Sequence, residues 1–286
     1  MKFGVQWMLV AVVALGANLA FAVNPESQGT WFSKSQKTGG ALFDDTGSEV
    51  VGVVEIKTGK ISKKNTVKVS GSITLMTTGK KVTAKGSNMT LTGGLLQGTL
   101  MFKSPVGAMS FVMDTTGSYT LENSNYSVQE ATLGGSLSSD VPTVSVEIDE
   151  EPDFGDKWCI LEEALPEDLE FTVKGNKWVF PKAAKVKYKK YKEDGETWYE
   201  LSGLDDDDDD KVRNYSGMKL SYSAKTGTFK GSFKVYTTNY ECGEDVKKPK
   251  IKKHSAKITG VILGGAGFGS ATMSKPKGGP WPVTIQ

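Results

Sequence analysis

The chain of 286 residues carries 35 Lys and Arg against 33 Asp and Glu, a net charge of +2. Its most basic part, residues 171–286, holds 22 cations, of which all but Arg213 are Lys. A single side chain able to make bidentate contacts with a base or phosphate argues against nucleic-acid binding.

The first 22 residues have the pattern of a secretory signal peptide. Lys2 supplies a positive start, residues 5–15 are mostly apolar, and Ala20-Phe21-Ala22 fits the small-x-small cleavage rule. The apolar run is shorter than the roughly 20 residues that a membrane-spanning helix needs. We therefore expect export to the periplasm, the cell surface or the exterior, with no transmembrane span in the mature chain.

Residues 23–139 are expected to form a first β module. Residues 23–48 predict an irregular lead-in with one short strand near Trp31-Phe32. Alternating apolar runs at 50–56, 66–75, 81–91, 96–103 and 108–113 then follow, separated by Gly or Pro turns. Short strands with turn signals every 8–12 residues are typical of a barrel or sandwich, and the abundant Gly, Thr, Ser and Val agree with that class.

Residues 140–170 form an acidic stretch with twelve Asp or Glu against Lys157 alone. Such a charge run predicts a solvated connector. The embedded run Trp158-Cys159-Ile160-Leu161 is apolar, so we expect part of the connector to pack on a module, with a short helix at 161–164.

A second β module is predicted for residues 171–286. Two clear signals are the Gly175-Asn176 turn and the hairpin of residues 218–222 and 228–236 around Lys225-Thr226-Gly227. Residues 253–273 (KHSAKITGVILGGAGFGSATM) also repeat the lysines and paired glycines of residues 81–101 (KVTAKGSNMTLTGGLLQGTLM). The sequence thus predicts an all-β chain of two related antiparallel meander modules, separate or joined into one larger β structure.

Three segments of this second module carry a resemblance: residues 178–182 (WVFPK), 218–236 (MKLSYSAKTGTFKGSFKVY) and 281–284 (WPVT). Together they resemble all-β modules of exported bacterial proteins of unassigned function, over about residues 178–285. The resemblance implies an all-β module and export, and it brings no catalytic residues.

Few residues of the sequence are candidates for a disulfide, a metal site or catalysis. Cys159 and Cys242 are the two cysteines, and an exported chain favours a disulfide between them. The run of six aspartates at 205–210 is expected to be a solvated loop, with a weak calcium site at Asp205, Asp207 and Asp209 as the alternative. His254 is the one histidine and occupies the place of Val82 in the repeat, so we interpret it as structural.

Aromatic residues concentrate in the second module and suggest a binding surface. Exposed aromatic rings on β modules can stack against sugars, and we expect such a platform from Trp178, Tyr188, Tyr191, Trp198 and Tyr199. No catalytic constellation is recognisable, so we expect a non-enzymatic structural or binding protein without a cofactor. The sequence does not identify its partner, and polysaccharide and envelope proteins are the candidates. A carbohydrate-binding module is the first alternative, and a hydrolase using paired carboxylates is the second.

Overall fold

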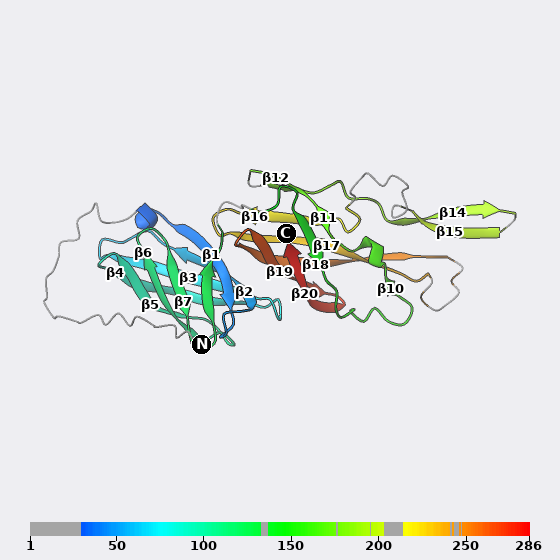
Figure 1. Cartoon of the computed structure of the whole chain (residues 1–286). Helices are drawn as coiled ribbons and strands as arrows, with labels where there is room; N and C mark the ends of the chain where they lie inside the picture. Colours follow the sequence, from blue (N-terminus) through cyan, green and yellow to red (C-terminus); the bar gives the residue numbers. More distant parts are fainter. Residues whose placement is uncertain are drawn as a thin grey trace, which may run out of the picture.

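A computed structural model describes residues 30–132, 137–175, 177–194, 196–202, 214–240, 242, 246 and 248–286. Apart from two short 3₁₀ helices, the regular elements in these residues are β-strands, which confirms the predicted all-β class. Figure 1 shows a barrel at one end of the molecule, a curled sheet beside it, and a long hairpin projecting from the far end of that sheet.

Eight antiparallel strands form the barrel, and they follow one another around it in chain order. The barrel closes because β1 pairs with β2 on one side and with β8 on the other. The strands are β1 (Gln36–Phe43), β2 (Val50–Thr58), β3 (Thr66–Leu75), β4 (Lys81–Thr92), β5 (Leu95–Met101), β6 (Ala108–Asp114), β7 (Tyr119–Glu122) and β8 (Ser127–Glu130).

Side chains fill the interior of this barrel. Alternate residues of each strand point inward, as in β3, where every second residue from Val67 to Leu75 is buried. Phe111, Leu100 and Met109 are among the large side chains with no exposed surface. Eight strands give an interior just wide enough to be filled in this way, so the barrel has a packed core rather than a ligand cavity.

The lead-in to the barrel differs from the prediction. Residues Thr30–Ser33 form the 3₁₀ helix η2 instead of a short strand, and β1 lies within the segment predicted to be irregular. Gly39 and Gly40 both lie inside β1, where other backbone comes very close. A Cβ on Gly39 would lie 2.1 Å from the Thr226 carbonyl oxygen, and one on Gly40 would lie 2.5 Å from that of Gln129.

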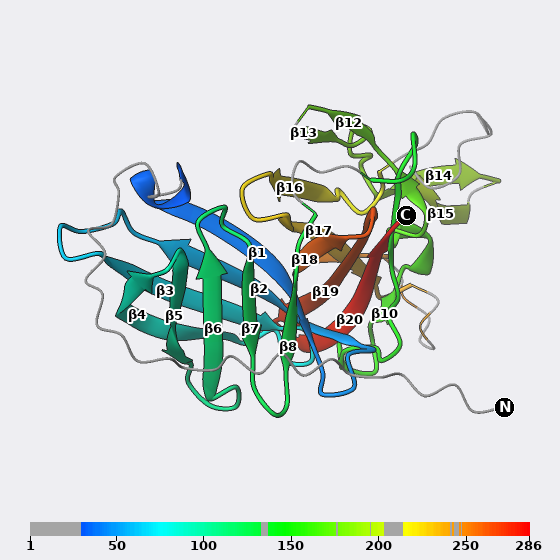
Figure 2. The same ribbon diagram turned by 60° about the vertical axis from the view of Figure 1, so that its left-hand side comes forward.

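The second module is an open, curled sheet (Figure 2). Its strands run in the order β10-β17-β18-β19-β20-β9-β11, and β16 also pairs with β17. They are β9 (Thr143–Val146), β10 (Cys159–Ile160), β11 (Leu169–Glu170), β16 (Lys219–Ser223), β17 (Thr228–Thr238), β18 (Ile251–Leu263), β19 (Ala266–Ser274) and β20 (Lys277–Ile285). Two separate hairpins, β12 (Thr172–Lys174) with β13 (Lys177–Val179) and β14 (Lys187–Glu193) with β15 (Glu196–Ser202), complete the module.

The acidic residues 140–170 contribute to this second sheet. They supply the short strands β9, β10 and β11, and the 3₁₀ helix η3 (Glu162–Ala164) lies where a short helix was predicted. Val144, Ile160 and Leu169 are buried in the core of the second module. Apolar residues spaced between the acids therefore fix the segment to the sheet, while its carboxylates stay at the surface.

The repeated stretches form equivalent hairpins in the two modules. In the barrel, β4 turns into β5 through Gly93 and Gly94, and in the second module β18 turns into β19 through Gly264 and Gly265. All four glycines have φ between 57° and 87°. Two successive residues in this left-handed region make the tight hairpin turn that Gly-Gly favours.

The two modules pack against each other along the outer face of β1 and β2. Ala41 and Val53 from the barrel, Ala131 just after it, and Val261 from β18 form a small buried cluster. Leu42 and Val54, their neighbours in sequence, belong instead to the barrel core. Both faces of β1 and β2 are thus covered, which explains why residues 50–54 are continuously apolar or Gly.

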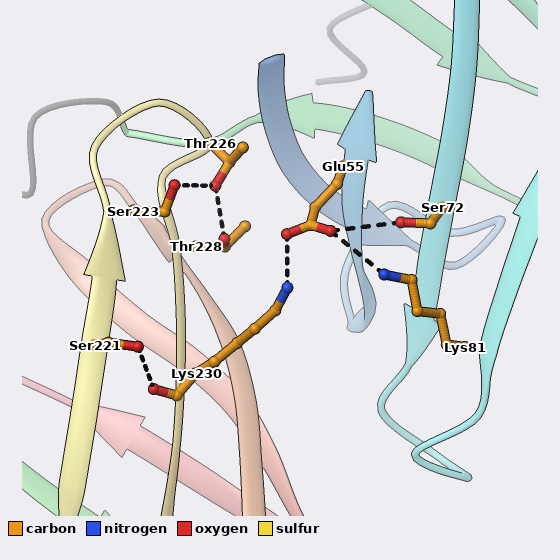
Figure 3. A network of polar contacts seen from close by, with 8 residues as sticks. All are labelled: Glu55, Ser72, Lys81, Ser221, Ser223, Thr226, Thr228 and Lys230. Carbon is orange, nitrogen blue, oxygen red and sulfur yellow. Dashed lines mark hydrogen bonds and ion pairs between the residues drawn. The ribbon is translucent and has the colours of Figure 1, made fainter. Parts of the chain in front are cut away.

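One carboxylate links the modules beside this cluster (Figure 3). Glu55 on β2 accepts a 2.6 Å hydrogen bond from the Lys230 ammonium of β17, and it lies 3.6 Å from the ammonium of Lys81 in the barrel. Burial alone would raise the pKa of Glu55, but the Lys230 hydrogen bond and the charges of both lysines outweigh it and lower that pKa.

Candidate functional site

The projecting hairpin β14–β15 carries four of the five predicted aromatic residues, and each of the four is half-buried or exposed. Its seven residue pairs run from Lys187 with Ser202 to Glu193 with Glu196, and Ser202 is its one buried residue. Figure 1 shows it extending away from the body of the molecule. The pairing register places the four predicted aromatic residues of this hairpin on two opposite faces.

One face carries an open aromatic pair. Tyr191 and Trp198 are directly opposite each other, and their rings are stacked with centroids 4.4 Å apart and planes at 16°. Trp198 remains 43% exposed. The Tyr191 hydroxyl is hydrogen-bonded to the Glu200 carboxylate, which raises the pKa of Tyr191 because the neutral phenol is the donor. Lys189 pairs with Glu200 in the same register, so charged groups border the rings.

The opposite face of the hairpin carries Tyr188 and Tyr199 and turns toward the sheet. The Tyr188 hydroxyl lies 2.8 Å from the Thr238 hydroxyl, and its ring meets Tyr240 edge-on with centroids 5.6 Å apart. Tyr188, Tyr199, Tyr240 and Cys159 line a shallow pocket of about 310 Å³. Tyr188 holds the hairpin against β17, and both tyrosines of this face are half-buried.

The prediction that Trp178 belongs to an exposed aromatic platform is wrong. It is 7% exposed and belongs to the core of the second module. Its ring stacks on Tyr222 at 5.3 Å and packs against Phe171 and Phe229 at 5.2 and 5.6 Å. Its place on a three-residue strand facing the sheet makes it a core residue, so Trp178 is not an exposed stacking platform.

The predicted disulfide is present. Cys159 and Cys242 are bonded across 83 residues of sequence, with Cα atoms 5.7 Å apart. Cys159 lies in β10, which pairs with the end of β17 at Thr238. The bond therefore fixes the segment that follows β17 to the acidic residues 140–170, directly beneath the hairpin β14–β15.

The predicted cation site, Asp205, Asp207 and Asp209, lies outside the described residues. Within the described part of the chain, no group of three or more His, Cys, Asp or Glu side chains is arranged to hold a metal ion. His254 is half-buried, with its Nε2 3.2 Å from the Thr237 hydroxyl and its ring against Phe154. Burial is the main cause that lowers the pKa of His254, and these neighbours give it no catalytic partner.

Sequence reasoning missed two pockets of the second module. An acidic pocket of about 480 Å³ is lined by Glu147, Glu151, Glu162, Glu167 and Asp168 from residues 140–170. A groove of about 540 Å³ lies between β13 and β16. The alternation of apolar and polar residues at 218–222 was the sequence signal for one of its walls.

Neither a family model, nor a curated protein sequence, nor a solved structure matches this chain. Among the residues that the structure describes, no helix is long and apolar enough to span a membrane.

Proposed function

We propose that this chain is an exported, non-enzymatic binding protein of the bacterial envelope or exterior, and that the hairpin β14–β15 binds polysaccharide. The observation that carries the proposal is the open Tyr191–Trp198 stack on a hairpin that projects from the body. Large aromatic side chains cost free energy when they stay in water, so a pair held in the open suggests a ligand that covers it.

The chemistry of the pair suits a sugar ring. The π face of an aromatic ring is electronegative, and the CH groups on one face of a pyranose can pack against it. The Glu200 hydrogen bond holds the Tyr191 ring in place, which reduces the entropy lost on binding. Lys189 and Glu200 offer a donor and an acceptor for sugar hydroxyls beside the rings.

The barrel supports this proposal as a scaffold. Its interior is packed with side chains such as Phe111 and Leu100 that have no exposed surface, so a ligand inside it would have to displace the core. An export pattern at residues 1–22 and a disulfide at Cys159–Cys242 agree with a protein that works outside the cytoplasm.

Affinity electrophoresis in gels containing neutral and acidic polysaccharides tests the proposal. We expect at least one polysaccharide to retard the wild-type chain and the Trp198→Ala variant to migrate as in a plain gel. Met101→Ala is the matched control, because Met101 is 62% exposed on the barrel and its loss should leave retardation unchanged. Absence of retardation with every polysaccharide would contradict the proposal, and release of new reducing ends would favour the hydrolase.

A further inference from the structure

A small cavity lies where the barrel meets the second sheet. The barrel contributes the end of β3 and the turn after it, and the second module contributes β18 and β19. Among the lining residues are Thr74, Met76, Lys257, Thr259, Ser270 and Thr272. The volume of about 110 Å³ is the space that roughly three or four water molecules occupy in the liquid, and a single phosphate group is of comparable size.

Close packing fixes the two walls of this cavity against each other. The Ser270 hydroxyl of β19 donates a 2.9 Å hydrogen bond to the Met76 carbonyl in the turn after β3. A Cβ on Gly79 in the same turn would lie 2.7 Å from the Thr272 Cγ2, so the turn approaches β19 as closely as a glycine allows. The cavity therefore exists without a ligand, which lowers the entropy lost on binding.

Hydroxyl groups form much of the polar lining. Thr74, Thr259 and Thr272 are half-buried, so packing restricts their side chains while solvent still reaches them. Within the described residues these three hydroxyls have no hydrogen-bond partner, whereas the hydroxyl of Ser270 is already used. Hydrogen-bond donors from β3, β18 and β19 thus surround one small space.

Each of these three threonines is directly opposite a lysine on the neighbouring strand. The pairs are Thr74 with Lys81, Thr259 with Lys230 and Thr272 with Lys257. Opposite residues of antiparallel strands have Cβ atoms about 4.5–5.5 Å apart. All three lysines are therefore long enough to reach the cavity, and Lys257 itself lines it.

Glu55 offsets only part of this positive charge, as Figure 3 shows. It accepts a hydrogen bond from Lys230 and lies 3.6 Å from the Lys81 ammonium, which keeps both cations at the junction of the modules. No carboxylate of the described residues pairs with Lys257, and no Asp or Glu is among the lining residues. Three lysines against one carboxylate leave a net charge of +2, which favours an anionic ligand.

The arrangement of donors favours a tetrahedral oxyanion over a planar carboxylate. A phosphate group carries a charge of about −1.5 to −2 at pH 7 and has at least three acceptor oxygens that point in different directions. Donors on three strands and an ammonium can therefore each bond to a separate oxygen. A carboxylate has two oxygens in one plane, and it would leave part of the donor set unused.

We propose that this cavity between the modules binds a phosphate group, either as the free ion or as a monoester. Lys257 pairs with its charge, since Lys binds phosphate as a point charge. Thr74, Thr259 and Thr272 donate hydrogen bonds to its oxygens. Lys81 and Lys230 strengthen the attraction from the rim. Because the ligand contacts both modules, its binding also holds them together.

Isothermal titration calorimetry with inorganic phosphate tests the proposal on the full chain. We expect saturable binding that weakens about ten-fold in Lys257→Gln, which removes the cation in the wall, and in Thr259→Val, which removes one donor. Lys253→Gln makes the same change in charge at another exposed position of β18, and this matched control should bind as the wild type does. Urea midpoints measured without phosphate check that each variant is folded.

Three comparisons complete the test. Glucose 6-phosphate that binds more tightly than inorganic phosphate would assign the cavity to a phosphate carried on a larger molecule, and the reverse order would assign it to the free ion. Acetate should bind at least about ten-fold more weakly than phosphate. Trp198→Ala should bind phosphate normally, which separates this site from the proposed polysaccharide site.

Three results would overturn the proposal. They are the absence of saturable phosphate binding, equal affinity of the wild type and Lys257→Gln for phosphate, and equal affinity of the wild type for phosphate and acetate.

Discussion

The barrel and the curled sheet use the same kind of hairpin, but they end differently. In the barrel, β8 returns to β1 and every strand is paired on both sides. In the second module, β16 and β11 are edge strands of the described sheet, and two further hairpins extend from it. Closure buries the barrel's apolar residues and leaves no edge for another chain, whereas the second module has edge strands and a projecting hairpin with an exposed aromatic ring.

A cavity in the barrel should have the largest effect on stability. Phe111 has no exposed surface, and we expect Phe111→Ala to reduce the free energy of unfolding by about 3–5 kcal/mol. Trp198→Ala in the hairpin should cost about 1 kcal/mol or less, since it removes one exposed cross-strand pair. Urea unfolding followed by circular dichroism measures both losses. Equal losses would contradict the view that the barrel supplies stability while the hairpin β14–β15 contributes little to it.

Loss of the disulfide should destabilise the second module. The bond closes 83 residues, and restricting an unfolded loop of that length stabilises by about 4.5 kcal/mol in the chain-entropy model. In the Cys159→Ala/Cys242→Ala variant we expect faster hydrogen exchange in β10 and β17, with β3 of the barrel unchanged. Faster exchange in β3 to the same degree would show that the modules unfold as one unit.

The Glu55 link should contribute less, because exposed lysines provide it. We expect Lys230→Met to lower the free energy of unfolding by about 1 kcal/mol and Lys81→Met by less, since Lys230 makes the shorter contact and joins the modules. Equal effects of the two substitutions would show that the contact between modules adds no more to stability than the contact within the barrel.

The Glu55 contribution should also depend on pH. A carboxylate whose folded pKa lies below its ordinary value of 4.5 stabilises the fold above that pH and loses this effect as the pH falls toward the folded pKa. The difference in stability between wild type and Glu55→Gln should therefore shrink in acid. A difference that stays constant from pH 7 to well below 4.5 would contradict the lowered pKa of Glu55.

The smallest effect concerns a hydroxyl inside the barrel. The Tyr119 hydroxyl is buried and has no hydrogen-bond partner among the described residues, and burial together with the Glu130 charge raises the pKa of Tyr119. We expect Tyr119→Phe to leave stability unchanged or raise it by about 1 kcal/mol. Tyr222→Phe is the contrasting variant, because its hydroxyl donates to the Thr132 carbonyl, and it should lose about 1 kcal/mol. A loss in Tyr119→Phe would show that the hydroxyl has a partner.

Patterns within single strands predicted the fold well. Alternation at residues 66–75 and the paired glycines at 93–94 and 264–265 identified strands and turns that the structure contains. Strand β1 was not predicted. Its Gly39 and Gly40 are needed because the backbone of Thr226 and Gln129, which are distant in sequence, leaves no room for a Cβ atom. The strands of residues 140–170 were not predicted either, because the many acidic residues indicated a solvated connector and the few apolar residues between them gave only a weak strand pattern.

The candidate site was predictable in part. The hairpin and its aromatic residues could be read from residues 187–202, because turn chemistry and alternation are local signals. Which rings stay exposed depends on packing: Trp178 and Trp198 look alike in sequence, but Trp178 faces the sheet core and Trp198 faces away from it. The groove between β13 and β16 depends on how segments distant in sequence pack together, and a local pattern does not contain that information.

Removing the tip of the hairpin β14–β15 tests most directly whether this hairpin of the second module binds polysaccharide. Replacing residues 190–199 with Asn-Gly joins Lys189 to Glu200. These two residues are directly opposite each other, and their pair lies on the same face of the hairpin as the pair Glu193 and Glu196 next to the natural turn. A two-residue turn can therefore close the shortened hairpin. We predict that this variant keeps the urea midpoint of the wild type and loses its retardation in polysaccharide gels. Retardation equal to that of the wild type would contradict the account.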